Sequence, residues 1–154
     1  MKKFILLIFI LSFTVQCGFK VVDQNINIFE ISEITTIGDK RINYRIKNKL
    51  LSTSQEGKDK VIKINLDTKK TRNIKEKNIK NIITKYEIII VAEVSFRKLN
   101  ETKLNKFNVN VSGDYTTSKQ ASITRNNEKE LVKLLTNKIS DKILKELKYK
   151  LDDL

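Results

Sequence analysis

Residues Tyr86–Phe96, YEIIIVAEVSF, carry the strongest local signal in the chain. From Tyr86 onward every second residue is apolar, which is typical of one face of a β-strand. The opposite face is also apolar in its middle, at Ile89 and Val91. A strand that is apolar on both faces is expected at the centre of a sheet or against a partner. We therefore predict that this segment is either the central strand of the fold or a strand that lies against a partner.

The segments on either side extend the sheet. After a polar turn at 100–105, Lys106–Tyr115 alternates apolar and polar residues and is expected to pair back as a hairpin. Lys60–Asp67 and Asn25–Ile37 alternate in the same way and are predicted to be strands. The basic run Asp67–Lys80 is open to three interpretations: a solvated loop, a hairpin arm, or part of a long strand. Together these segments predict four strands.

A helix is expected between the first two strands, at Lys40–Leu51. Its apolar residues Ile42, Ile46 and Leu50 lie four apart and therefore share one face. Asp39 directly precedes it and can cap its first turn by accepting a hydrogen bond from a free backbone N–H.

The last helix is predicted to open near Asn126, with Asn127 as N-cap and Glu130 three residues later as in a capping box. Its apolar stripe consists of Leu131, Leu135, Ile139, Ile143 and Leu147, supported by Leu134, Leu144 and Leu151. The element order β-α-β-β-β-α predicts an α+β two-layer sandwich, with a mixed four-stranded sheet and both helices on one face.

The N-terminal segment predicts export. Two lysines precede an apolar run from Phe4 to Phe13, interrupted only by Ser12, which matches a secretory signal and is shorter than the ~20 residues of a membrane span. Cys17, the chain's only cysteine, stands where cleavage is expected, as in a lipobox. Thr14-Val15-Gln16 departs from the usual Leu and small residues, so an ordinary secreted chain and an uncleaved anchor remain alternatives. The predicted organisation is a signal peptide at 1–16, a lipidated tether at 17–25 and a single α+β domain at 26–151.

Composition narrows the class of function. The chain has no histidine, which removes the commonest general base and the commonest metal ligand. No catalytic or metal-binding constellation stands out, so we expect no enzyme, no metal and no cofactor.

Charge points to the kind of partner. Cleavage before Cys17 would remove 16 of 154 residues and leave 29 basic and 18 acidic side chains, a net charge of +11. Such a charge favours acidic lipid headgroups or phosphorylated glycolipid, although AT-rich coding sequence would also produce many lysines. Nucleic acid is not expected, because the chain carries an export signal and lacks an aromatic-basic RNA-binding motif.

The start of the mature chain, Cys17-Gly18-Phe19, together with this element order resembles the LPS-assembly lipoprotein family (LptE). Mature chains of that family begin Cys-Gly-aromatic. Their hydrophobic strand opens on a sequence similar to Lys85-Tyr86-Glu87-Ile88-Ile89. Before the last helix they often carry a basic residue and then Asn-Glu, here Arg125-Asn126-Asn127-Glu128.

The resemblance implies a non-enzymatic role at the outer membrane. A family member sits inside the lumen of a large β-barrel (LptD), supports its assembly and binds lipopolysaccharide (LPS) on its way to the cell surface. It is held at the periplasmic side by a lipid, which would be attached here to Cys17. The LPS-contacting positions of the family fall at Arg125 and near Lys77 or Lys80. The same element order would also suit an auxiliary lipoprotein subunit of a lipid-transport ABC system.

Mass spectrometry of the protein extracted from membranes tests the lipobox. We expect a mature N-terminus at Cys17 that carries a diacylglycerol. An intact Met1, or a free thiol at Cys17, would contradict lipidation.

Overall fold

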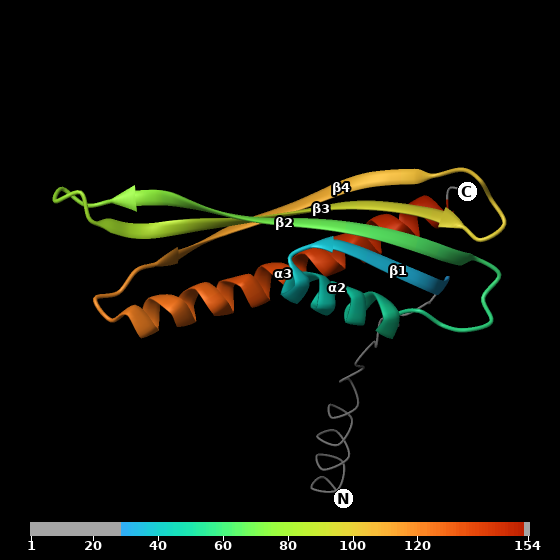
Figure 1. The fold of residues 1–154 in the computed structure, drawn as a ribbon, viewed down its shortest axis with the longest axis horizontal. Helices are drawn as coiled ribbons and strands as arrows, with labels where there is room; N and C mark the ends of the chain where they lie inside the picture. Colours follow the sequence, from blue (N-terminus) through green and yellow to red (C-terminus); the bar gives the residue numbers. More distant parts are fainter. Residues whose placement is uncertain (1–28, 153–154) are drawn as a thin grey trace, which may run out of the picture.

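The computed structural model describes residues 29–152, so Cys17 and the predicted signal peptide lie outside the described part. The elements follow one another as β1 (Glu30–Gly38), α2 (Lys40–Ser52), β2 (Val61–Lys77), β3 (Ile83–Lys98), β4 (Asn105–Thr116) and α3 (Ala121–Asp152). Figure 1 shows both helices on one side of the sheet, which confirms the α+β two-layer sandwich.

The sheet is mixed and has the order β1-β2-β3-β4. β1 runs parallel to β2, whereas β2, β3 and β4 pair antiparallel. β3 therefore lies between two hydrogen-bonded neighbours, as its two apolar faces predict. The basic run after Asp67 belongs to β2, which continues to Lys77 and pairs antiparallel with β3. The run is therefore both part of a long strand and an arm of a hairpin, and the solvated-loop interpretation is wrong.

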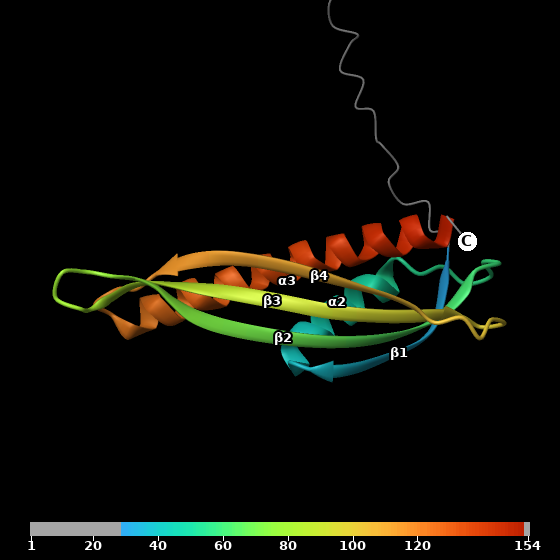
Figure 2. The ribbon, with the colours of Figure 1, turned by 90° about the horizontal axis from the view of Figure 1, so that it is seen from above.

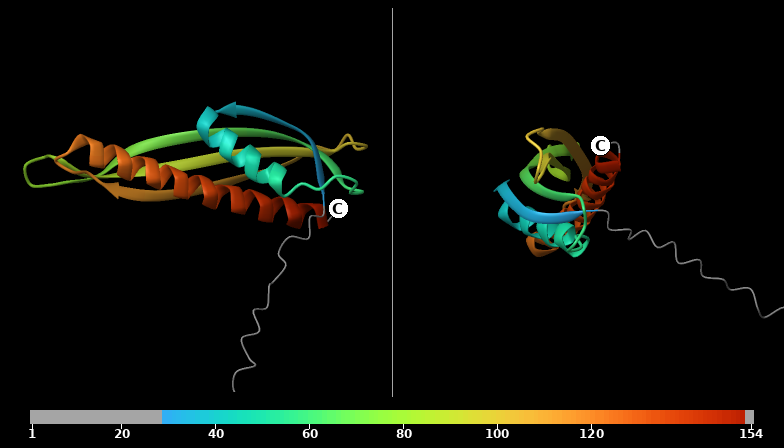
Figure 3. Two further views of the ribbon diagram at one scale, coloured as in Figure 1. Left: turned by 90° about the horizontal axis from the view of Figure 1, so that it is seen from below. Right: turned by 90° about the vertical axis from the view of Figure 1, so that its right-hand side faces the viewer.

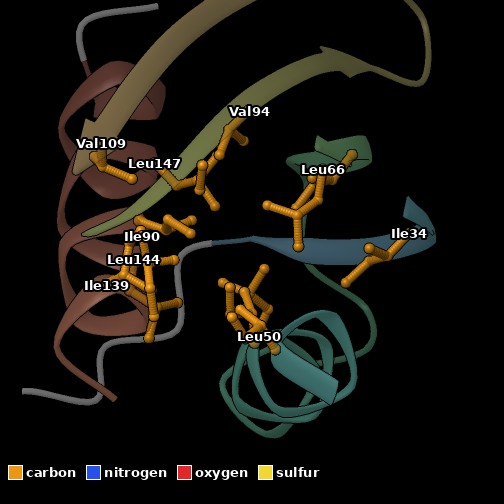
Figure 4. Close-up of a cluster of buried hydrophobic side chains, with 14 of the residues drawn as sticks. Ile34, Leu50, Leu66, Ile90, Val94, Val109, Ile139, Leu144 and Leu147 are labelled. Carbon is orange, nitrogen blue, oxygen red and sulfur yellow. The ribbon is translucent and has the colours of Figure 1, made fainter. Parts of the chain in front are cut away.

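The core lies between the helices and the facing side of the sheet. On β3 the buried side chains are the alternating residues Ile88, Ile90, Ala92, Val94 and Phe96. Ile42, Ile46 and Leu50 of α2 meet this layer, and α3 adds Leu135, Ile139, Ile143 and Leu147. Figure 4 shows members of this cluster converging from both helices and from the strands.

The last helix differs from its prediction at two points. α3 begins at Ala121, so Asn127 is not its N-cap but an internal residue whose side-chain amide donates to the Thr116 carbonyl, at 3.0 Å. The segment from Ala121 to Arg125 lacks a repeat of apolar residues, so the sequence pattern does not predict that it is helical. Leu134 is 50% exposed instead of supporting the stripe, because it is rotated about 100° around the helix from buried Leu135.

A buried polar contact joins the start of α2 to the sheet. The Asn43 amide donates to the Ile37 carbonyl at 2.8 Å and accepts from the Thr68 hydroxyl at 2.7 Å. The side chains of Asn43 and Thr68 are almost fully buried, so removing either one would leave a buried polar group without a hydrogen bond and lower the stability of the fold. Asp39 accepts from the backbone N–H groups of Arg41 and Ile42, as its position before the helix predicts.

The domain is elongated, and its two layers differ in length. Figures 2 and 3 show α2 and α3 side by side beneath the sheet, and the β2–β3 hairpin extends beyond the start of α3. β1 begins at the opposite end of the long axis from the tip of this hairpin (Figure 2). Among the described residues, neither helix is both long enough and apolar enough to span a membrane.

Gly38 provides a test of the junction between β1 and α2. Its φ is +98°, and a Cβ there would lie 1.9 Å from the Thr68 carbonyl oxygen. Gly38→Ala is therefore expected to lower the free energy of unfolding by about 3 kcal/mol or more, from backbone strain and overpacking together. Denaturant unfolding followed by circular dichroism measures this.

Gly57→Ala is the matched control for this substitution. Gly57 also has a positive φ, +75°, but a Cβ there meets nothing within 4 Å. Only the backbone strain of about 1–2 kcal/mol should remain. Equal losses in the two variants would contradict the close approach of Gly38 to Thr68.

Candidate functional site

A groove of about 450 Å³ lies where the start of α2 meets the first half of α3. Its lining includes two helix faces and one residue of β2, Lys70. The apolar part is formed by Ile42, Val132 and the methyl-bearing Thr136. Its volume is within the usual range of small-molecule sites, about 300–1,000 Å³.

Basic side chains dominate the polar part of the groove. The lining contains six of them: Arg41, Arg45, Lys70, Arg125, Lys129 and Lys133. Only two acidic residues, Asp39 and Glu128, accompany them. Of these six groove residues, only Lys70 has an ion-pair partner within residues 29–152. The groove therefore has a surplus of positive charge that is available to an anionic ligand.

Helical spacing brings these cations together. Arg41 and Arg45 are four residues apart and share one face of α2. Arg125, Lys129 and Lys133 follow the same spacing along α3. The two faces contribute to the same groove, so charges from separate helices can meet one ligand.

Glu128 neutralises part of the adjoining surface. Its carboxylate lies 4.0 Å from the Lys70 ammonium and 3.3 Å from the Arg72 guanidinium. It also accepts a hydrogen bond of 3.1 Å from the Tyr115 hydroxyl. Glu128 thus pairs with two cations of β2, whereas the five helix cations that line the groove have no ion-pair partner within residues 29–152.

Two stacked tyrosines support this contact. The rings of Tyr86 and Tyr115 lie 5.6 Å apart, and the Arg72 guanidinium sits 4.8 Å from the centre of the Tyr86 ring. Burial raises the pKa of the Tyr115 phenol, an effect partly opposed by its hydrogen bond with Arg72. That same hydrogen bond is the largest cause of a raised pKa at Arg72. The cluster stays neutral at the phenol and charged at the guanidinium under physiological conditions.

The structure separates the site residues predicted from the sequence. Arg125 lines the groove, within α3 instead of ahead of it. Lys77 ends β2 and Lys80 lies in the following turn, and neither lines the groove. Whether these three residues bind LPS stays a prediction.

The sequence analysis missed the other basic residues of the groove. Their four-residue spacing was a usable signal, because it places Arg41 with Arg45, and Arg125 with Lys129 and Lys133. Nothing local indicated that the two helix faces would meet. Among the described residues, no group of three or more His, Cys, Asp or Glu side chains could hold a metal ion.

Comparison with known proteins identifies the architecture. No known protein family and no curated protein matches the sequence. Solved structures do match. Rare lipoprotein B from Shewanella oneidensis superposes with a TM-score of 0.61 at 16% identity, over 79% of this chain and 97% of that one. Lipoprotein B from Nitrosomonas europaea, described as uncharacterized, has a TM-score of 0.60 at 12% identity, over 77% and 82%.

The chain has the fold of these bacterial lipoproteins. At such low identity the likeness establishes the fold and carries no residue roles. The element order of this chain, β-α-β-β-β-α, is the one predicted from the sequence, and it is one of the features that resemble the LPS-assembly lipoproteins.

The titration of Tyr115 tests the cluster at the edge of the groove. Because its folded-state pKa is raised, the unfolded chain loses this proton first as pH rises through about 10. Above that pH the unfolded state binds fewer protons, so stability falls as pH increases further. Tyr115→Phe should remove the last phenol to ionise in an ultraviolet titration and weaken the alkaline fall in stability. Near neutral pH it should cost about 1 kcal/mol through the lost hydrogen bond to Glu128.

Tyr44→Phe serves as the control, because the Tyr44 side chain is 67% exposed. This variant should retain the late ionisation. A wild-type titration in which all phenols ionise together would contradict the environment assigned to Tyr115.

Proposed function

We propose that the protein is an outer-membrane lipoprotein of the LPS-assembly type. In this role it plugs the lumen of an LPS-translocon β-barrel, supports the assembly of that barrel and binds LPS during insertion at the cell surface. The groove between α2 and α3 supports the proposal most directly, because five of its cations have no ion-pair partner among residues 29–152.

The chemistry of the groove suits phosphate groups of lipid A. Arginine presents a planar fork of donors that matches a phosphate, and charge-assisted hydrogen bonds are stronger than neutral ones. Arg41, Arg45 and Arg125 line the groove together, which allows more than one guanidinium to meet one phosphorylated headgroup. Arg125 remains the first candidate. Lys77 and Lys80 would have to act at a second position, along the hairpin.

The dimensions and surface of the domain also suit a plug. A helix of 32 residues such as α3 is about 48 Å long, comparable to the roughly 40–45 Å of a bilayer with its headgroups. The sheet face turned away from the helices carries mostly polar residues, among them Asn65, Asp67, Glu93 and Asn108. The lumen of a transmembrane β-barrel is likewise polar.

Charge reversal in the groove tests the binding of LPS. Arg41→Glu combined with Arg125→Glu removes two cations and introduces two repulsive charges. We expect the affinity for LPS, measured on immobilised LPS at low salt, to fall by at least about tenfold, since a hydrogen bond to a charged group contributes roughly 1.5–3 kcal/mol.

Arg97→Glu combined with Lys103→Glu is the matched control for the groove variant, because it changes the net charge by the same amount at two exposed residues outside the groove. Arg97 is exposed on β3 and lines no part of the groove. Thermal unfolding of both variants shows whether the fold is retained. If the control variant loses as much affinity as the folded groove variant, binding is a matter of net charge and the groove has no special part.

Affinity purification from detergent-solubilised membranes tests the barrel. We expect the mature protein to recover a large β-barrel protein, and its depletion to reduce LPS at the cell surface. Recovery of an inner-membrane transporter instead would favour the auxiliary role in a lipid-transport ABC system. A free monomer with normal surface LPS after depletion would contradict both.

A further inference from the structure

The tip of the β2–β3 hairpin exposes apolar side chains that contribute nothing to the core. Ile79 is fully exposed, at 102% of its reference area, and Ile82 is 59% exposed. Ile74, farther down the hairpin on β2, is 53% exposed. Scattered apolar residues on a surface need no explanation, but these three occur on one projecting element (Figure 1).

The turn itself does not require isoleucine. The backbone N–H of Asn81 donates to the backbone carbonyl of Asn78, so Ile79 and Lys80 occupy the two central positions of the turn. The Asn78 side chain accepts from the backbone N–H groups of Lys80 and Ile82, and Asn81 takes the left-handed conformation with φ of 61°. The asparagines therefore form the turn. Turn centres favour Gly, Pro, Asn, Asp and Ser, so an exposed isoleucine there departs from the local preference and adds nothing to the stability of the fold. Such departures are found at functional sites.

Basic residues surround these isoleucines. Residues 69–85 contain seven Lys or Arg and one Glu, a net charge of +6. Lys75 pairs with Asp114 and Lys85 with Glu76, which ties down the stem of the hairpin. Lys77 and Lys80, nearest the tip, have no ion-pair partner within residues 29–152.

We propose that the hairpin tip, Ile79 and Ile82 with Lys77 and Lys80, inserts into the surface of an anionic lipid bilayer. Isoleucine side chains that leave water for the acyl boundary gain the free energy that the fold does not give them. Lysines can bury their alkyl stems and keep the ammonium at the headgroups, where anionic lipid attracts it.

A bilayer fits this tip better than a protein pocket. The isoleucines lie at the end of a narrow hairpin, and lysines lie beside them and along its strands. This order matches a bilayer, in which anionic headgroups cover an apolar layer of acyl chains. The tip is separate from the groove, so its insertion depends neither on LPS binding in the groove nor on the barrel.

The absence of tryptophan from the chain makes a direct test possible. Ile79→Trp places a single fluorescent reporter at the tip of the full-length protein. Ile37→Trp is the matched control, since Ile37 is also exposed, at 69%, but lies near the end of β1. Any lipid anchor or uncleaved signal is common to both variants, so only the position of the reporter differs.

The probe is a vesicle of phosphatidylcholine with phosphatidylglycerol, with and without brominated acyl chains. Tryptophan at position 79 should shift its emission to the blue, and brominated lipid should quench it at least about twofold, as expected for a ring at the acyl boundary. Tryptophan at position 37 should show neither change. In the Ile79→Trp background, Lys77→Gln with Lys80→Gln should raise the lipid concentration needed for half of the blue shift by about tenfold or more.

Three results would overturn the proposal. The first is an emission at position 79 that stays typical of water while the protein is bound to the vesicles. The second is equal quenching at positions 37 and 79, which would mean that the whole domain lies on the membrane. The third is a shift that appears only when a protein partner is added, which would assign the tip to that partner.

Discussion

The fold depends on covering one side of β3. Its alternating residues from Ile88 to Phe96 are buried, and a strand interior to the sheet can remove them from water only under another layer. α3 lies along this side with its four-residue stripe, and α2 covers the part nearer to β1. Both helices are thereby confined to one face, and the opposite face of the sheet is left mostly to polar residues, with Ile89 and Val91 of β3 as apolar exceptions.

The groove lies where the apolar packing between the helices and the sheet ends. Along β2 the helix-facing residues change from apolar Leu66, through Thr68, to charged Lys70 and Arg72. At that level the start of α2 and the first turns of α3 present basic residues in place of leucine. The hydrophobic contact ends there, and the same layers that form the core form a charged groove at its margin.

Glu128 decides which of these charges are available. It contacts Lys70, Arg72 and the Tyr115 hydroxyl, so the sheet side of this region is internally balanced. The five arginines and lysines that the helices contribute to the groove have no ion-pair partner among the described residues. An anionic headgroup would thus meet the helix cations, while stacked Tyr86 and Tyr115 hold the sheet side in place.

The sequence by itself determined the element order, the central position of β3, the α2 helix with its Asp39 cap and the apolar stripe of α3, because these depend on periods of two or nearly four within one segment. It also contained the four-residue spacing of Arg41 with Arg45 and of Arg125 with Lys129 and Lys133. Only the tertiary structure decided that these two faces meet in one groove, that the basic run after Asp67 is strand, and that α3 starts at Ala121. Those outcomes depend on pairing with β3 and on contacts such as that of Asn127 with Thr116, which join residues distant in the chain and leave no periodic signal in it.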